Sequence, residues 1–441
     1  MNAQVTAVPD RVSPGLSSQV LRQLNHWEGA AERLDDFEAS ASPEAWASLE
    51  KYVGVALRGG LKQARDQLRR ESIAVRAAFN AVHTRSQLEL VGDQVALLRK
   101  RYMQTESLVD FYVAAVRARA NPEVGLQLRA CDVMAERSVR GALEPLGIKA
   151  PPIMTYFSTG VGASILRIGT RLWDGSLSPI AAIRLTFSGR FRTTALFHEC
   201  GHQFAGLTGW NEALTPLFRS RLCGAAGSGL AGIRSMPAGN EFADIVAGWS
   251  SEIAADAFAF ANTGYASVVA LSDVVAGRGA EVFRFLPSDP HPISYLRVLL
   301  GVEMCRRFYG MGPWDDLADA WQQQYPLHLA PQVAATIVAA VTPLLPRIVD
   351  ASLLTPLPCF KGKSLAQIVD PQRAAPAELR EMERKAGGSV FTSSHWIWNE
   401  CIRLTALTGL RYATEPEKGP QILKQQEDWM IRLGHLKAAV A

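Results

Sequence analysis

One short motif constrains the fold of this chain more than any other feature. His198 and His202 stand four residues apart, and Glu199 directly follows the first of them. On an α-helix this spacing puts both imidazoles on one face, about one turn apart, so that both can bind a single metal ion. Glu199 then lies beside the ion, where it can take a proton from a metal-activated water.

The residues around this motif are mainly apolar, which is typical of a buried helix; they are Phe197, Phe204, Ala205 and Leu207. We expect this helix to cover residues 191–207 and Gly209 to be its C-cap, with Trp210 packing back. Cys200 faces away from the ion and is expected in the core. The alternative is two histidines on a surface helix, but buried His and Glu without partners are costly.

Catalytic zinc needs a third protein ligand and one open position. Glu252 is the candidate ligand, because the rest of its helical stretch, residues 240–261, is mainly apolar. Asp256, one turn later, can accept a hydrogen bond from the outer nitrogen of a ligating histidine and fix its tautomer. An acidic pair in such a helix must be neutralised. A divalent cation does so, and the alternative is a buried ion pair with an arginine such as Arg297.

Three motifs together resemble a known family. They are HExxH at 198–202, ExxAD at 252–256 and HPxxxxR at 291–297. Their order and spacing are those of the gluzincin zinc metallopeptidases, and the third motif is similar to that of the CAAX-prenyl-endopeptidase and HtpX-type peptidases and their small soluble relatives. The resemblance covers roughly residues 190 to 300. It implies a zincin-like core with one zinc ion per chain.

The resemblance also implies a role for each matching residue. Zinc is bound by His198, His202 and Glu252, and Glu199 is the catalytic base. His291 lies close to the metal, where it touches zinc in a resting state or stabilises the developing oxyanion, and Arg297 braces the acidic residues. The chain lacks the membrane-spanning helices of many members and adds helical flanks, so we expect no membrane-embedded or prenylated substrate.

His291 can also be interpreted without the family. It precedes Pro292, and we expect it at the start of a helix that runs to Tyr309, where the positive helix end favours a neutral, metal-binding imidazole. The alternative is an exposed histidine in a turn. Tyr295 and Tyr265 are further candidates for hydrogen bonding to an oxyanion.

The chain divides by composition into four segments. Residues 1–15 are polar and expected to be disordered, 16–148 read as a helical bundle, 149–325 as the metallopeptidase core, and 326–441 as a helical C-terminal region. Within the core, residues 153–157, 164–168 and 180–187 are expected strands, and 223–232 a Gly/Ser-rich loop. An edge strand within 180–187 is the candidate partner for an extended substrate backbone.

Composition excludes several function classes. The formal net charge is only +4 and no long Lys/Arg block occurs, so nucleic acid is not an expected partner. The six cysteines form no CxxC pair, and four lie in apolar surroundings, as buried free thiols do. We find neither a secretion signal nor about twenty uncharged apolar residues in a row, and therefore expect a cytoplasmic protein without membrane insertion.

The sequence thus predicts an α+β, mostly α chain with a zincin-like core and a small sheet, flanked by helical regions. We expect a zinc metalloendopeptidase, a hydrolase of protein or peptide substrates, in which the flanks restrict access and make it selective or regulated. Two alternatives remain: a zinc-binding regulatory or interaction protein with a catalytically silent site, and a helical interaction scaffold with a vestigial site.

Overall fold

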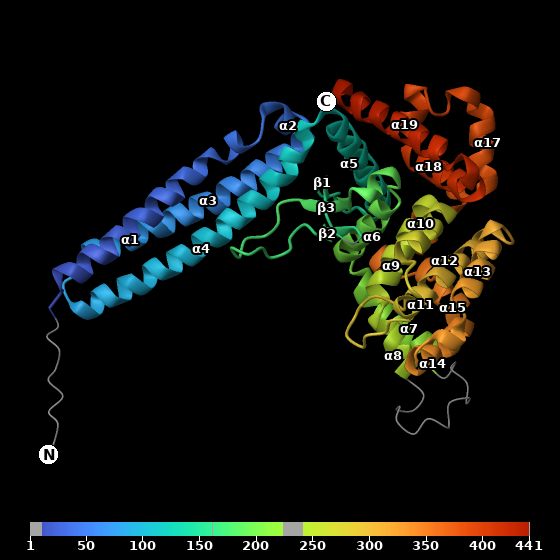
Figure 1. Cartoon of the computed structure of the whole chain (residues 1–441), viewed down its shortest axis with the longest axis horizontal. Coiled ribbons are helices and arrows are strands. Elements are labelled where there is room, and N and C mark those ends of the chain that lie inside the picture. Colours follow the sequence, from blue (N-terminus) through green and yellow to red (C-terminus); the bar gives the residue numbers. More distant parts are fainter. Residues whose placement is uncertain (1–10, 161, 224–240, 441) are drawn as a thin grey trace, which may run out of the picture. The chain divides into compact units, whose positions relative to one another are not determined.

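The computed structural model describes residues 11–160, 162–223 and 241–440 (Figure 1). Helices dominate, and the described residues form one three-stranded sheet, which confirms the α+β, mostly α fold class. The chain splits into two compact units. The first runs to Asn121 and includes Ile168–Ile180, and the second comprises Pro122–Arg167 and Ala181–Ala441.

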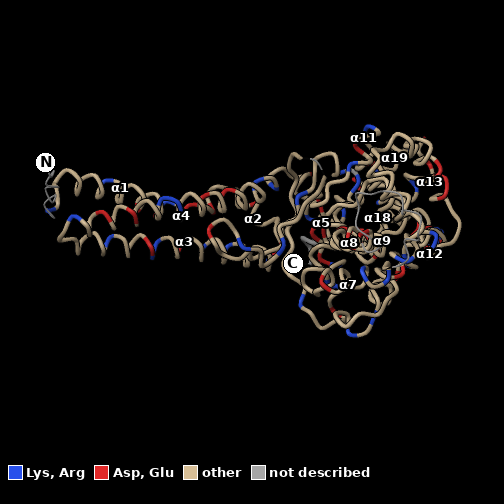
Figure 2. The backbone as a smooth tube through the Cα atoms, turned by 90° about the horizontal axis from the view of Figure 1, so that it is seen from below, with Lys and Arg blue, Asp and Glu red and all other residues tan. Residues whose placement is uncertain are grey.

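The first unit is built on three long helices and one short helix, α2, that pack against one another. They are α1 (Pro14–Arg33), α2 (Pro43–Ala47), α3 (Lys51–Asn80) and α4 (Arg85–Arg117). In α4, Leu88, Val91, Val95 and Leu98 are buried at the predicted spacing of three and four residues. Residues of both charge signs occur along α1, α3 and α4 (Figure 2). Helix α1 begins inside the segment expected to be disordered, most of which lies outside the described residues.

The sheet belongs to the second unit and contains the three predicted strands. These are β1 (Ile153–Ser158), β2 (Ser164–Leu166) and β3 (Ala181–Thr186), in the order β1-β3-β2. β1 runs parallel to β3, with Ile153 opposite Ala181, and β2 runs antiparallel to it.

The prediction that residues 180–187 supply an edge strand is wrong. β3 is the central strand, because its backbone pairs with β1 on one side and with β2 on the other. Ala181, Ala182, Ile183 and Leu185 of β3 are all buried, which suits the middle of a sheet covered on both faces. The short β2, whose residues are exposed or half-buried, forms one edge.

Helices make up the rest of the second unit. They are α5 (Pro122–Leu143), α6 (Ala195–Thr208), α7 (Trp210–Leu222), α8 (Glu241–Gly248), α9 (Ser250–Thr263), α10 (Tyr265–Val275), α11 (Gly279–Val282), α12 (Ser294–Tyr309), α13 (Pro313–Gln324), α14 (Gln332–Val341), α15 (Leu345–Val349), α16 (Leu365–Ile368), α17 (Pro376–Ala386), α18 (Ser394–Thr414) and α19 (Gly419–Val440).

Three predicted helix boundaries differ from the structure. The motif helix α6 begins at Ala195, after extended backbone at Arg192. The stretch 240–261 is two helices, α8 and α9, because the backbone at Trp249 leaves the helical region. Helix α12 begins only at Ser294, after extended backbone at Ile293. Residue 240 and residues 224–232 of the predicted loop lie outside the described residues.

The packing of α6 against α9 sets the geometry of the motif region. Gly201 of α6 lies so close to α9 that a Cβ there would come within 2.7 Å of the Ala255 Cα. One turn further, Phe204 stacks on Phe258 with ring centroids 5.1 Å apart. The α6 C-cap is Gly209 in the left-handed conformation, and the following Trp210 is buried, as predicted.

One helical run among the described residues, Gln332–Leu354, is long and apolar enough to cross a membrane by length and composition. Its most apolar window is 56% buried, and buried core helices meet the same criterion. The run is therefore weak support for a membrane span. It extends past the apolar residues 333–342 because helices continue through Arg347 and Asp350.

Candidate metal centre

The two motif histidines lie side by side on α6, as their spacing predicts. The ring centroids of His198 and His202 are 4.7 Å apart, and their Nε2 atoms are 3.1 Å apart. Both side chains are largely buried, with 17% and 16% exposed. Two nitrogen atoms that face each other at this distance suit a shared cation between them.

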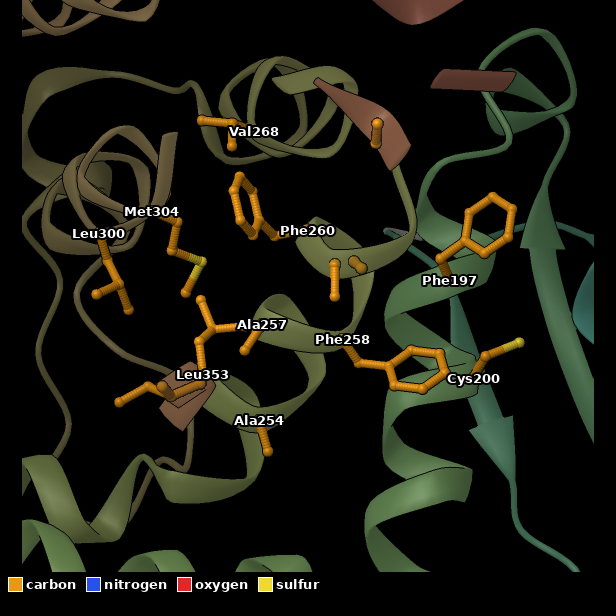
Figure 3. Close-up of a cluster of buried hydrophobic side chains, with 14 of the residues drawn as sticks. Phe197, Cys200, Ala254, Ala257, Phe258, Phe260, Val268, Leu300, Met304 and Leu353 are labelled. Atoms are coloured by element: carbon orange, nitrogen blue, oxygen red, sulfur yellow. The ribbon is translucent and has the colours of Figure 1, made fainter. Parts of the chain in front are cut away.

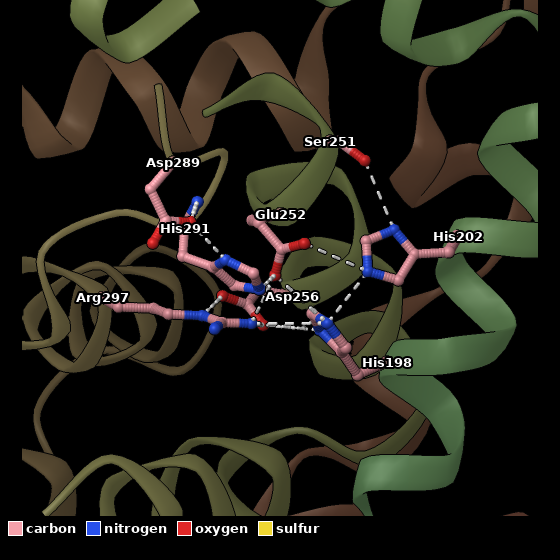
Figure 4. A network of polar contacts seen from close by, with 8 residues as sticks. All are labelled: His198, His202, Ser251, Glu252, Asp256, Asp289, His291 and Arg297. Carbon is pink, nitrogen blue, oxygen red and sulfur yellow. Dashed lines mark hydrogen bonds and ion pairs between the residues drawn. The ribbon is translucent and has the colours of Figure 1, made fainter. Parts of the chain in front are cut away.

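Glu252 of α9 meets these two nitrogens. Its carboxylate oxygens lie 3.4 Å from His198 Nε2 and 3.3 Å from His202 Nε2 (Figure 4). One ligand atom from each of the three residues lies within 4.8 Å of the others, so that this group could hold a metal ion. Glu252 is only 5% exposed, and among the described residues its Oε2 makes ion-pair contacts, such as that with Arg297 at 3.1 Å, but no hydrogen bond of normal geometry. A buried carboxylate oxygen in this state can also bind a cation.

Each histidine has a partner on its outer nitrogen. Asp256, one turn after Glu252, lies 2.8 Å from His198 Nδ1, the contact that we expected from the sequence. Ser251 Oγ lies 3.3 Å from His202 Nδ1. These contacts leave the Nε2 atom of each ring for the metal. Ser251 was not among the residues expected at the site, although its position directly before Glu252 was a usable signal.

Arg297 of α12 joins the two carboxylates. Its guanidinium lies 2.5 Å and 2.9 Å from the two oxygens of Asp256, and 3.1 Å from Glu252 Oε2. The side chain is buried, as is that of Glu252, and the side chain of Asp256 is 13% exposed. The metal-ligand and the ion-pair interpretations of Glu252 are therefore compatible, because one carboxylate faces both the histidines and Arg297.

The buried charges shift one another's titration in the metal-free protein. Burial alone would raise the pKa of Glu252, but hydrogen bonds from His198 and His202 lower it. Burial would lower the pKa of His198, yet hydrogen bonds to Asp256 and Glu252 raise it to about 9. Burial would raise the pKa of Asp256, but the charge of Arg297 and the contacts with His198 together lower it. The site is thus a network of opposite charges.

Glu199 follows His198 on α6 but does not belong to the ligand group. It is 5% exposed and lines the same cavity as the three ligands. Burial raises the pKa of its carboxyl above the usual value of 4.5. A carboxylate of raised basicity beside a metal site suits a general base, whose pKa should approach the working pH.

His291 lies in the loop before α12 and points towards the same group. Its Nε2 is 3.7 Å from Glu252 Oε2, and 57% of the side chain is exposed. Our expectation that His291 sits at a helix start is wrong, because α12 begins three residues later. Instead Asp289 holds the ring. It lies 2.6 Å from Nδ1 and also accepts a hydrogen bond from the His291 backbone N–H at 3.0 Å.

Asp289 is the second residue that the sequence analysis missed. Because its carboxylate occupies Nδ1, the free nitrogen of His291 is the one near Glu252. The sequence signal was an acidic residue two positions before the histidine, a spacing that favours side-chain bonding to the local backbone.

The structure does not bring the two candidate tyrosines to the site. The Tyr265 hydroxyl donates to the Pro313 carbonyl at 3.2 Å, and its ring packs against Trp314. Tyr295 packs its ring against Phe283 and is 6% exposed. Neither tyrosine lines the cavity that contains the histidines, because each faces the apolar interior.

A single cavity of about 1330 Å³ contains this group of residues. Its walls come from β2 and the end of β3, from α6, α9, α10 and α12, and from the loop with His291. This volume exceeds that of a typical small-molecule site. The cavity has room for several residues of an extended chain, and β2 lies along one wall.

Comparison with protein-family models, curated proteins and solved structures finds no match to this chain. The functional argument therefore rests on the residues and geometry of the metal centre.

Proposed function

We propose that this chain is a zinc-dependent metalloendopeptidase that hydrolyses peptide bonds. One observation carries the proposal: helices α6 and α9 bring His198, His202 and Glu252 within 4.8 Å of one another, and Glu199 lines the same large cavity. Two imidazoles and one carboxylate form a common ligand set of catalytic zinc in peptidases. The resemblance to gluzincins, and to the soluble relatives of CAAX-prenyl-endopeptidase and HtpX-type peptidases, points to the same chemistry.

Zinc fits this donor set better than other common cations. Magnesium and calcium prefer sites made of oxygen ligands, whereas imidazole nitrogen suits zinc and other transition metals. His198, His202 and Glu252 would hold the ion, and three protein ligands are the number found at catalytic zinc sites, which keep a position open for water or substrate. When bound, zinc supplies Lewis acidity, which lowers the pKa of a water molecule and polarises the scissile carbonyl.

The chain's own residues provide the remaining steps. Glu199 accepts the proton of the attacking water and delivers it to the leaving amine. Asp256 and Ser251 hold His198 and His202 in the tautomer that leaves Nε2 free. With both ring nitrogens protonated, His291 donates Nδ1–H to Asp289 and Nε2–H to the carbonyl oxygen as that oxygen gains charge.

The substrate backbone has a natural place in the cavity. β2 is an edge strand and lines the cavity, so it can pair with an extended peptide by strand addition. This role replaces the one that we first assigned to β3. An extended peptide along β2 passes the metal centre and presents one bond to Glu199.

Two measurements test the proposal. Metal analysis should find one zinc per chain in the wild type and none in His198→Ala. Digestion of a degenerate peptide library should give cleavage by the wild type, and Glu199→Gln should cleave about 10²- to 10⁴-fold more slowly while keeping its zinc. Equal inertness of both proteins, with zinc bound, would contradict the peptidase proposal.

That contradictory outcome would favour a second candidate, a zinc-binding regulatory protein with a silent site. The position of His291 gives this candidate its support, because its Nε2 lies only 3.7 Å from Glu252 and can fill the fourth zinc position. A His291→Ala variant that gains activity would identify this latent state.

A further inference from the structure

Arg167 directly follows the edge strand β2 and lines the cavity that contains the candidate metal centre. The residue is exposed. β2 is the strand on which we place an extended substrate backbone. A peptide that pairs with β2 therefore passes beside the Arg167 side chain on its way to the metal ligands.

The Arg167 side chain lies against Gly206 of α6. A Cβ added to Gly206 would come within 3.0 Å of Arg167 Nη1 and 3.5 Å of its Cδ. Gly206 follows His202 by four residues, as His202 follows His198, so the three share one face of the helix. Four residues correspond to about 6 Å along a helix axis. A positive charge thus lies on the same wall as the metal ligands, about one helical turn beyond them.

The packing of α6 determines which of its faces carries this charge. Figure 3 shows Phe197 and Cys200 of α6 in a cluster of buried apolar side chains that also contains Phe258 of α9. This packed face leaves the opposite one, with the histidines and the exposed Gly206, towards the cavity. Glycine inside a helix is less stable than alanine. At this position, however, any side chain would meet Arg167.

The charge of Arg167 is unpaired within the protein. Arg297 and Arg192 line the same cavity, and each of them forms an ion pair with a carboxylate. Among the described residues, no hydrogen bond or ion pair engages the guanidinium of Arg167. Glu212, an exposed acid of the same cavity, is not paired with it either. A guanidinium beside the substrate path is therefore available to a ligand.

We propose that Arg167 is a specificity-determining residue that binds a carboxylate of the substrate about two residues from the cleaved bond. The inference rests on the proposed function. Successive residues of an extended chain are about 3.3 Å apart, so two of them span the turn of α6 between His202 and Arg167. A planar guanidinium binds a carboxylate through two parallel hydrogen bonds. The carboxylate belongs either to an Asp or Glu side chain or to the C-terminus of a peptide.

Zinc-binding probes test this role without the natural substrate. The monohydroxamates of succinate, glutarate and adipate carry a carboxylate at increasing distance from the zinc-binding group. Each is compared with the same molecule in which an amide replaces the carboxylate, by calorimetric titration into the zinc-loaded full chain. At one chain length the carboxylate should bind about three- to tenfold more tightly than the amide. In Arg167→Gln this preference should disappear.

Two further variants separate Arg167 from the general charge of the cavity. Arg167→Glu should reverse the preference, so that a hydroxamate with a terminal amine binds more tightly than the amide of equal length. Arg284→Gln is the matched control, because Arg284 is another exposed arginine that lines the cavity. It should keep the preference for the carboxylate. If Arg284→Gln loses this preference and Arg167→Gln keeps it, the role of Arg167 is refuted.

Peptide libraries distinguish the two sources of the carboxylate. In a library with amidated C-termini, enrichment of Asp or Glu at one fixed position near the cut identifies a side chain. In a library with free C-termini, cleavage at a fixed distance from the end identifies the terminal carboxylate. Cleavage of both libraries without either preference would contradict the role of Arg167 and leave the peptidase proposal intact.

The remaining outcomes keep the two proposals apart. If the zinc-loaded chain binds the amide probes but gains nothing from a carboxylate at any length, only the role of Arg167 is refuted. If the carboxylate preference is present but neither library is cleaved, Arg167 binds acidic ligands and the peptidase proposal fails. If no hydroxamate binds, the metal has no open position, and both proposals fail together.

Discussion

Two helix pairs in this molecule are built in opposite ways. α3 and α4 pack through large apolar side chains, and ion pairs such as Arg85–Glu89 lie on exposed faces. α6 and α9 instead approach through small residues at Gly201 and Ala255, and they carry acidic side chains such as Glu252 into the interior. The first arrangement is what stability alone favours.

The difference between the two helix pairs indicates that α6 and α9 carry the candidate functional site. Burying a charge costs several kcal/mol unless it is paired, so stability alone gives a helix pair no reason to hold five largely buried ionisable groups. These groups are His198, Glu199, His202, Glu252 and Asp256. The second unit keeps Glu252 and Asp256 in the interior by pairing both carboxylates with Arg297 and with the imidazoles. That cost is understandable for a site that binds a cation, and the comparison yields measurable consequences.

The largest expected effect follows removal of the buried arginine. Arg297→Met leaves Asp256 and Glu252 buried without their guanidinium partner, and should lower the free energy of unfolding of the metal-free protein by about 3–5 kcal/mol. Arg85→Met in α4 removes an exposed partner and should cost about 0–0.5 kcal/mol. Denaturant unfolding of EDTA-treated protein measures both. Equal costs would remove the distinction between the two helix pairs.

A smaller effect is expected from one methyl group at the helix contact. In Gly201→Ala the new Cβ meets the Ala255 backbone, so the helices must separate, which should cost about 1–3 kcal/mol and weaken zinc binding. Gly59 of α3 is the matched position in the other helix pair, with no atom within 4 Å of an added Cβ.

Gly59→Ala should therefore stabilise the chain by about 0.5–1 kcal/mol, through improved helix propensity, and should not change zinc binding. Thermal unfolding and chelator competition provide the two measurements. If Gly201→Ala and Gly59→Ala change the free energy of unfolding in the same direction and leave zinc binding alike, the close approach of α6 and α9 does not align the ligands.

Much of the fold could be predicted from local pattern. The spacing of Leu88, Val91 and Val95 gave the face of a long helix, and short β-branched runs marked three strands. The order of those strands could not be predicted, because the pairing of β3 with both neighbours depends on contacts between distant segments. The break at Trp249 did have a local signal that the single predicted helix over 240–261 passed over, since Gly248 directly precedes it.

The metal ligands could be predicted because helical spacing alone puts His198 and His202 together, and because a carboxylate in the apolar surroundings of Glu252 needs a positively charged partner. The contacts around these ligands could not be predicted. Ser251 and Asp289 are common polar residues whose roles depend on the direction of a side chain. Tyr265 failed as a candidate for the same reason, because its hydroxyl faces the Pro313 carbonyl.

The buried network also predicts how pH affects the stability of the metal-free protein. The folded pKa of His198, about 9, is above its ordinary value of 6.5, so its contribution to stability is complete below about pH 6.5 and lost as pH rises through 9. Burial would raise the pKa of Asp256 above 3.8, but the charge of Arg297 and the contacts with His198 together lower it, so its contribution is present above about pH 4 and lost in acid.

The smallest expected effect is a pH dependence of opposite sign for stability and zinc binding. Zinc must displace the His198 proton, so its affinity should rise about tenfold per pH unit between pH 6.5 and 8.5, while the metal-free protein loses stability. Chelator competition and thermal unfolding of EDTA-treated protein measure the two curves.

In Asp256→Asn the rise in zinc affinity should move to lower pH, because a neutral amide stabilises the His198 imidazolium less than a carboxylate does. His83→Gln, at an exposed histidine of the first unit, should change neither curve. Zinc affinity that is flat over this range would mean that His198 is already neutral, and that the buried charges do not act as one network.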